Sequence, residues 1–261
     1  IDPIVRRIMV KKRRLVLLLI FLFPGALCAE SVTNNSALDV IKLIDDMEEL
    51  YRGDASKAEI TMRVETPYYK RSMKMESINL GTEKAFIRIL SPKKERGVST
   101  LKIDKEMWNY LPKINKVIKV PPSLMMGSWM GSDFTNDDLV KQTTLTEEYN
   151  LELAETDDTY IIDLTPRAQT VTVWGRIEYT ISKADRIPLS QGFYDDKGDL
   201  IRSLVFKDPK MFQGRLIPSV MEMIPLNKEG HKTVIVYDAL DFSPSGVNDS
   251  IFSLRNLRKR F

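Results

Sequence analysis

The sequence predicts a mainly β (α+β) protein in which about ten antiparallel strands form one long sheet. Downstream of Gly53, apolar residues recur at every second position in many segments, which is the period of a half-buried strand. Short polar loops separate these segments and are typical of hairpins, so strands adjacent in sequence are expected to pair. The clearest alternating segments are residues 60–65, 85–89, 176–181, 200–206 and 233–237, and the clearest loops are residues 156–159, 183–186, 195–199 and 227–230.

A sheet of this length must curl, because the twist between neighbouring strands accumulates across it. Its apolar concave face then needs a cover, and the sequence offers two helical segments. The first is predicted over residues 37–52, with Ser36 as its cap, Gly53 after its end and apolar residues at helical spacing. Short helical pieces are predicted near residues 135–140.

The N-terminal segment predicts export from the cytoplasm. Four basic residues at positions 11–14 precede an uninterrupted apolar run from Leu15 to Phe23, and Pro-Gly-Ala-Leu-Cys-Ala follows. This order is typical of a secretory signal peptide, and the run is shorter than the roughly 20 residues of a membrane span. Met9 is the expected natural start. Residues 1–29 are therefore interpreted as an upstream extension plus signal peptide, and residues 30–261 as a single domain in the periplasm.

Cys28 leaves two alternatives for the mature protein. Cleavage after Cys28 or Ala29 gives a periplasmic protein without cysteine, whereas lipidation of Cys28 gives a membrane-anchored form. The large Leu27 before the cysteine disfavours lipidation. Removing residues 1–29, which hold six basic residues and one acidic residue, changes the net charge from +3 to −2. A nucleic-acid partner is therefore not expected, because such binding requires a concentrated basic face.

Residues 107–134 have the most informative composition in the chain. A strand leads through Pro112 into a second strand and then into a loop hinged by Gly127 and Gly131. The large apolar side chains of this loop are Met125, Met126, Trp129, Met130 and Phe134. Such side chains are costly to expose, and methionine adapts to ligands of varied shape. We expect the loop to lie at or over the mouth of a hydrophobic cavity, although an ordinary loop packed on a core is the alternative.

The strand before this loop has two different faces. Strand alternation places Trp108 and Tyr110 on one face and Met107 and Leu111 on the other. Only one pair can line a cavity, and the aromatic pair is the one we expect there.

Short motifs in a fixed order extend this interpretation over nearly the whole chain after residue 29. They are Tyr51-Arg52-Gly53-Asp54, Arg88-Ile89-Leu90-Ser91-Pro92, Trp108-Asn109-Tyr110-Leu111-Pro112, residues 127–135, Trp174-Gly175-Arg176-Ile177, Phe193-Tyr194-Asp195, Ile217-Pro218-Ser219 and residues 252–257. In this order they resemble the bacterial outer-membrane lipoprotein-sorting proteins, the LolA-like periplasmic carriers. The resemblance implies a LolA/LolB-like fold, an incomplete antiparallel β-barrel whose open side is covered by helices, with acyl chains held in the cavity between them.

Few residues in the chain suggest catalysis or metal binding. His231 is the one histidine and lies in a charged turn, so a Ser-His-Asp triad or a multi-histidine metal site is not expected. The adjacent acidic pairs at 137–138, 157–158 and 195–196 are interpreted as turn or helix-start residues. No phosphate-binding glycine loop or nucleophile elbow is recognisable. We expect a protein that is not an enzyme and has no cofactor.

The predicted function is that of a periplasmic carrier that binds acyl chains of lipoproteins or lipids and moves them toward the outer membrane. Its expected partners are lipoprotein acyl chains or free lipid, an inner-membrane transporter and an outer-membrane acceptor, and it is expected to be a monomer. Two alternatives remain open: a periplasmic lipid-binding accessory of an inner-membrane transporter, and a surface-exposed adhesin or structural β protein. The sequence does not identify the cargo or the direction of transport.

Overall fold

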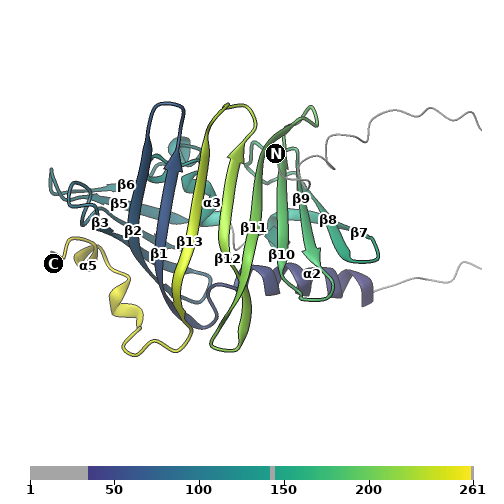
Figure 1. Cartoon of the computed structure of the whole chain (residues 1–261), viewed down its shortest axis with the longest axis horizontal. Helices are drawn as coiled ribbons and strands as arrows, with labels where there is room; N and C mark the ends of the chain where they lie inside the picture. The colour runs from purple at the N-terminus through teal and green to yellow at the C-terminus, as the bar shows by residue number, and fades with distance from the viewer. Residues whose placement is uncertain (1–34, 142–144, 260–261) are drawn as a thin grey trace, which may run out of the picture. The chain divides into compact units, whose positions relative to one another are not determined.

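Thirteen antiparallel strands form one open sheet in the computed structural model, which describes residues 35–141 and 145–259 (Figure 1). The strands are β1 (Ala55–Glu65), β2 (Lys70–Leu80), β3 (Lys84–Ser91), β4 (Ser99–Ile103), β5 (Glu106–Leu111), β6 (Lys116–Lys119), β7 (Tyr149–Glu155), β8 (Thr159–Pro166), β9 (Arg176–Ser182), β10 (Pro188–Tyr194), β11 (Leu200–Phe212), β12 (Arg215–Pro225) and β13 (Lys232–Asp241). The mainly β, antiparallel prediction is confirmed. The predicted signal peptide, its cleavage site and Cys28 lie outside the described residues.

The sheet consists of two meanders joined by one long-range pairing. Its strand order is β6-β5-β4-β3-β2-β1-β13-β12-β11-β10-β9-β8-β7. Hairpin neighbours therefore pair as predicted, while β1 and β13, the first and last strands, meet in the middle of the sheet. The count of about ten strands was too low. Strand β4 illustrates why: polar Ser99, Thr100 and Lys102 occupy buried positions next to Leu101, which hides its alternation.

Helices connect or cover the sheet in three places. They are α2 (Asn35–Glu49), the 3-10 turns η1 (Pro122–Leu124) and η2 (Trp129–Gly131), α3 (Asn136–Lys141) and α4 (Leu145–Glu148), and at the C-terminal end η3 (Asp249–Ile251) and α5 (Leu254–Leu257). Both predicted helical segments are confirmed, and α2 begins at Asn35, one residue before the predicted cap. In residues 35–141 and 145–259, no helix is long and apolar enough to cross a membrane.

The core is divided between the two faces of the sheet. On the concave face, Leu43, Ile44 and Met47 of α2 pack on strands β8 to β12, and Trp129 packs on strands β1 to β3. On the outer face, Phe252 and Leu257 cover a third cluster formed by Phe86, Leu101 and Tyr110. The C-terminal segment therefore protects the outside of β3 to β5, while α2 and the connection from β6 to β7 cover the inside.

An arginine ties this C-terminal segment to the sheet. Arg88 of β3 donates from Nη2 to the Asn256 carbonyl oxygen at 2.7 Å and from Nε to Ser99 Oγ at 3.0 Å. Its guanidinium also lies 4.5 Å from the centre of the Phe86 ring. Strand alternation places Arg88 on the face opposite the cavity. It is buried nevertheless, because the C-terminal segment folds over it.

Leu257→Ala tests how much the C-terminal segment contributes to stability. Leu257 is fully buried, so its truncation should lower the free energy of unfolding by about 2–5 kcal/mol. Leu254→Ala in the same helix, where the side chain is 44% exposed, should cost less than about 1 kcal/mol. Urea unfolding of both variants measures the difference, and equal losses would contradict the assigned packing.

Candidate functional site

A cavity lies between the concave face of the sheet and the segments that cover it. Its volume is about 190 Å³, and side chains from α2, the β6–β7 connection and ten strands line it. Most of the lining is apolar or aromatic, including Met47, Met75, Ile87, Trp129, Phe134 and Phe206. Residues from both meanders reach the same cavity, so the sheet curves around it as the sequence predicted.

The loop that closes the cavity is fixed to three strands of the sheet. Trp129 Nε1 donates to Thr100 Oγ1 of β4 at 3.1 Å, and Arg71 of β2 donates to the Met130 carbonyl oxygen. The Asp133 amide donates to Thr233 Oγ1 of β13 at 2.9 Å, and that hydroxyl donates to Asp133 Oδ2 at 2.7 Å. These contacts hold the loop on the concave face, where its aromatic side chains enter the cavity.

Gly131 allows the arginine contact. It has a φ of +69°, and a Cβ there would lie 3.2 Å from Arg71 Nη2. Met130 before it also has a left-handed conformation, with a φ of 50°. The tight turn therefore brings the loop backbone to the guanidinium, and a side chain at Gly131 would push the two apart.

The structure divides the predicted site residues into two groups. Trp129 and Phe134 line the cavity and are 4% and 3% exposed. Met125 and Met130 are half-buried, and Met126 is 36% exposed; none of these three lines the cavity. Trp129 and Phe134 also belong to the buried clusters of the core, so these two side chains fit both interpretations of the loop.

The strand before the loop has the opposite orientation to the one expected. Trp108 and Tyr110 of β5 belong to the cluster under the C-terminal segment, on the outer face. Asn109 and Met107 pair with Thr100 and Lys102 of β4, which do line the cavity. The prediction that Trp108 and Tyr110 share one face of the strand was therefore correct. That face is the outer one, where the C-terminal segment covers both aromatic side chains.

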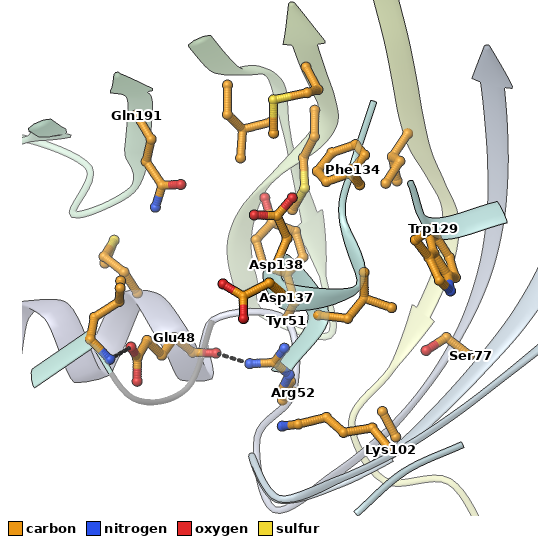
Figure 2. Close-up of a pocket in the computed structure, with 18 of the residues that line it drawn as sticks. Glu48, Tyr51, Arg52, Ser77, Lys102, Trp129, Phe134, Asp137, Asp138 and Gln191 are labelled. Atoms are coloured by element: carbon orange, nitrogen blue, oxygen red, sulfur yellow. Dashed lines mark hydrogen bonds between the residues drawn. The ribbon is translucent and has the colours of Figure 1, made fainter. Parts of the chain in front are cut away.

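Charged groups gather at one end of the cavity. Figure 2 shows Arg52, which follows α2, beside Lys102 of β4, with Glu48 of α2 on its other side and Phe134 farther away. Arg52 Nη1 donates to the Glu48 carbonyl oxygen at 3.3 Å, and Lys102 Nζ donates to the Thr82 carbonyl oxygen at 2.7 Å. Reasoning from sequence did not assign these residues to the site, although Arg52 is part of a recognised motif and Lys102 is a lone cation inside a strand.

Burial shifts the pKa values of Glu48, Arg52 and Lys102 in the direction that favours the uncharged form of each side chain. Desolvation raises the pKa of Glu48 to about 7, against the smaller effect of the Leu145 amide, which donates to Glu48 Oε1 at 3.1 Å. Desolvation, and secondly the charge of Arg52, lowers the pKa of Lys102 to about 8. Burial also lowers the pKa of Arg52. The end of the cavity near α2 is thus a poorly solvated polar region.

A buried ion pair attaches α3 to the opposite side of the cavity. Arg202 of β11 contacts both carboxylate oxygens of Asp138, from Nη1 at 2.8 Å, and the two side chains are 5% and 12% exposed. Trp174 and Phe193 lie on the guanidinium, with ring centres 4.5 and 4.2 Å from its carbon. Removing one member of such a pair leaves a buried charge, so this contact positions α3 strongly.

Neighbouring motifs shape the pocket around this ion pair. A Cβ at Gly175 would lie 2.6 Å from the Asp195 carbonyl oxygen, so only glycine permits this approach of two backbones. The Gly175 amide donates to the Tyr194 carbonyl oxygen at 2.9 Å, and the rings of Trp174 and Phe193 are 5.3 Å apart. Two motifs recognised in the sequence are therefore parts of one local structure.

Other polar groups near the cavity do not form a recognisable catalytic arrangement. His231 Nδ1 lies 3.6 Å from Asp133 Oδ1, outside the residues that line the cavity. Within the part of the chain that the structure describes, no group of three or more His, Cys, Asp or Glu side chains could hold a metal ion.

Comparisons with known proteins agree with this architecture. A family model described as "Uncharacterized protein" matches residues 81–259. The chain belongs to that family. A search of curated proteins gave no significant match.

Solved structures of similar proteins identify the fold of this chain. The chain is similar to a putative outer membrane lipoprotein-sorting protein domain from Vibrio parahaemolyticus, with 20% identity, a TM-score of 0.73, and 85% of this chain and 100% of that chain covered. A DUF1329 family protein from Desulfovibrio piger matches with 24% identity, a TM-score of 0.73 and coverages of 86% and 100%. A LolA superfamily protein from Nitrosomonas europaea matches with 18% identity, a TM-score of 0.68 and coverages of 83% and 98%. The chain therefore has a LolA-like fold, as its motifs predicted.

Glu48→Gln tests the environment of the polar end through the pH dependence of stability. The pKa of Glu48 is raised from 4.5 to about 7, so the native state binds more protons than the unfolded state between these values. The free energy of unfolding should fall as pH rises through this window, and the fall should be complete above about pH 7. Glutamine cannot ionise but keeps an oxygen for the Leu145 amide. The variant should therefore be more stable than the wild type by on the order of 1–2 kcal/mol at about pH 8, with no gain at about pH 4.

Urea unfolding of the ligand-free protein across this pH range measures the effect. Glu49→Gln is the matched control, because Glu49 adjoins Glu48 in α2 but is exposed. A gain that is the same for both variants, or the same at every pH, would contradict the assigned environment of Glu48.

Proposed function

We propose that this protein is a periplasmic, non-enzymatic carrier that binds acyl chains of lipoproteins or lipids in its cavity and moves them toward the outer membrane. The observation that carries the proposal is the largely apolar cavity between the curved sheet and its covering segments. The LolA-like fold supports it, since one solved relative is described as a lipoprotein-sorting protein. The cavity depends on contacts made by both meanders, so a large part of the chain contributes to forming it.

The hydrophobic effect supplies the affinity for such a ligand. Each methylene group buried against an apolar wall contributes about 0.8 kcal/mol, so six methylene groups contribute about 5 kcal/mol. An apolar cavity of about 150 Å³ admits benzene, so the 190 Å³ present here holds only a short part of a long acyl chain. A whole chain requires the cover to move away from the sheet.

The contacts described above indicate which part of the cover has to move. The loop and α3 are attached through polar contacts with Arg71, Thr233 and Arg202, and through the buried side chains of Trp129 and Phe134. Helix α2 packs on β8 to β12 through its apolar side chains. On opening, the polar groups could be hydrated by water, and a bound acyl chain could replace the apolar contacts that Trp129 and Phe134 lose. Displacement of the loop and α3 would therefore open the cavity for loading, and their return would protect the bound chain from water.

The remaining functional assignments belong to the same proposal. Loading from an inner-membrane transporter and delivery to an outer-membrane acceptor would provide the direction that an apolar cavity alone does not. The nearest alternative is an accessory of an inner-membrane transporter that passes free lipid. A surface adhesin, from a different class, would have no need of a cavity and would carry no lipid.

Ser77→Leu tests binding in the cavity itself. Ser77 of β2 lines the cavity, so a leucine side chain there would occupy space needed by the ligand. Affinity for a fluorescent fatty-acid probe should fall at least about tenfold, a change of about 1.4 kcal/mol. Fluorescence titration measures the affinity, and circular dichroism checks that the variant is folded.

Ser72→Leu is the control, because Ser72 lies on the exposed face of the same strand. It should bind the probe as the wild type does. Native mass spectrometry of protein purified from its periplasm should also detect co-purified lipid. Wild-type protein that neither carries lipid nor binds the probe would overturn the carrier proposal and favour the adhesin alternative.

A further inference from the structure

The cavity is not uniformly apolar, and two cationic side chains lie at its polar end. Arg52 follows α2 and Lys102 lies in β4, and Figure 2 shows both side chains at the same end of the cavity. Ser77 and Asn79 of β2 and Thr100 of β4 also line the cavity. Away from this end, the walls are the side chains of residues such as Met75, Phe134 and Phe206. A ligand that satisfies both regions has a charged head and an apolar chain.

Lys102 is a buried cation. It is 2% exposed, and its ammonium group donates to the Thr82 carbonyl oxygen at 2.7 Å. A buried ammonium is costly, and Arg52 raises this cost because the two positive charges repel each other. With a pKa of about 8, Lys102 is nevertheless mostly protonated at neutral pH. An anion placed between the two groups would offset both the desolvation and the repulsion.

The acidic groups around Lys102 do not remove this positive charge. Those whose charges act on it are Asp104, Glu48 and Glu83. Asp104 and Glu83 are outside the cavity lining, and Glu48, with a pKa of about 7, is only partly ionised at neutral pH. Asp138 is engaged by Arg202, and Glu48 is the acidic group whose charge acts on Arg52. Asp137 also lines the cavity.

We propose that Arg52 and Lys102 receive the anionic headgroup, a carboxylate or a phosphate, of an amphiphile whose chain occupies the apolar part of the cavity. This inference rests on the proposed carrier function and narrows its substrate class. It favours a free anionic lipid over the acyl chains of a lipoprotein, which have neutral ester and amide links at their head. Arginine matches either anion by two parallel hydrogen bonds, and lysine supplies a compact charge.

Competition among amphiphiles with one chain length and different heads tests the proposal on the wild-type protein. An uncharged apolar dye, N-phenylnaphthylamine, reports occupancy of the cavity by its fluorescence. Dodecanoate, dodecyl phosphate, dodecanol and dodecyltrimethylammonium are then compared as competitors, below the concentrations at which they form micelles. Both anions should displace the dye at concentrations at least about tenfold lower than dodecanol. The ratio between the two anions identifies the preferred headgroup.

Substitutions at the polar end test whether Lys102 and Arg52 cause the preference for anionic amphiphiles. Lys102→Gln and Arg52→Gln should each weaken the binding of both anions by about tenfold. The affinity for dodecanol should stay within about twofold of its wild-type value. Lys102→Met, which keeps the apolar stem without the charge, provides a second variant if glutamine impairs folding. Lys105→Gln is the matched control, because this lysine lies in the β4–β5 hairpin with its side chain 65% exposed. It should bind every competitor as the wild type does.

Each result separates this inference from the carrier proposal. Equal displacement by dodecanoate and dodecanol, or a preference for the cationic amphiphile, would overturn the headgroup inference and leave the carrier proposal standing. An anion preference that persists in the Lys102 and Arg52 variants would overturn the assignment to these residues. Failure of the dye and of all four amphiphiles to bind would overturn both proposals.

Discussion

The pairing of β1 with β13 is the contact on which the cavity depends. Residues 57–65 pair with residues 232–241 along nearly the whole length of both strands. This pairing joins two meanders, which are otherwise built from hairpins, into one sheet with β6 and β7 at its edges. The chain between these edges must then cross the concave face, and it carries Trp129, Phe134 and α3 over the cavity.

Local patterns predicted the elements of this fold well, and the long-range contacts poorly. The helical spacing before Gly53 and the alternation after it identified α2, most strands and their hairpins. Neither pattern contains information about β13 returning to β1. Strand alternation likewise separated Trp108 from Met107 but could not say which face is the inner one. The answer depends on Phe252 and Leu257, which arrive from the end of the chain and make an apolar outer face favourable.

The site was only partly predicted, because it too depends on contacts between segments that are distant in sequence. Trp129 and Phe134 were recognisable because large apolar residues on a glycine-hinged loop are unfavourable in water. Lys102 was not, since a single lysine in a strand is usually solvated, and its burial depends on segments distant in sequence that cover this face of the sheet. Arg88 is a similar case on the outer face, where the Asn256 carbonyl oxygen accepts from its guanidinium.

A carrier must hold its ligand firmly and still release it, and the two regions of this cavity offer different means of doing so. Apolar contacts with a chain are non-directional and change little with pH. Contacts between an anion and the pair Arg52 and Lys102 depend on charge, and Glu48 beside them has a pKa near neutrality. Release therefore could be promoted either by movement of the cover or by a competing charge, whereas an entirely apolar cavity would offer only the first.

The position of a bound chain tests the central claim most directly. A crystal structure of the protein with dodecanoate brominated at its terminal carbon would locate the bromine by its anomalous scattering. The account predicts one bromine position inside the cavity, against the side chains around Phe134 and Phe206, with the carboxylate toward Lys102. A bromine on the outer face or at scattered surface positions, with the cavity between α2 and the sheet unoccupied, would contradict it.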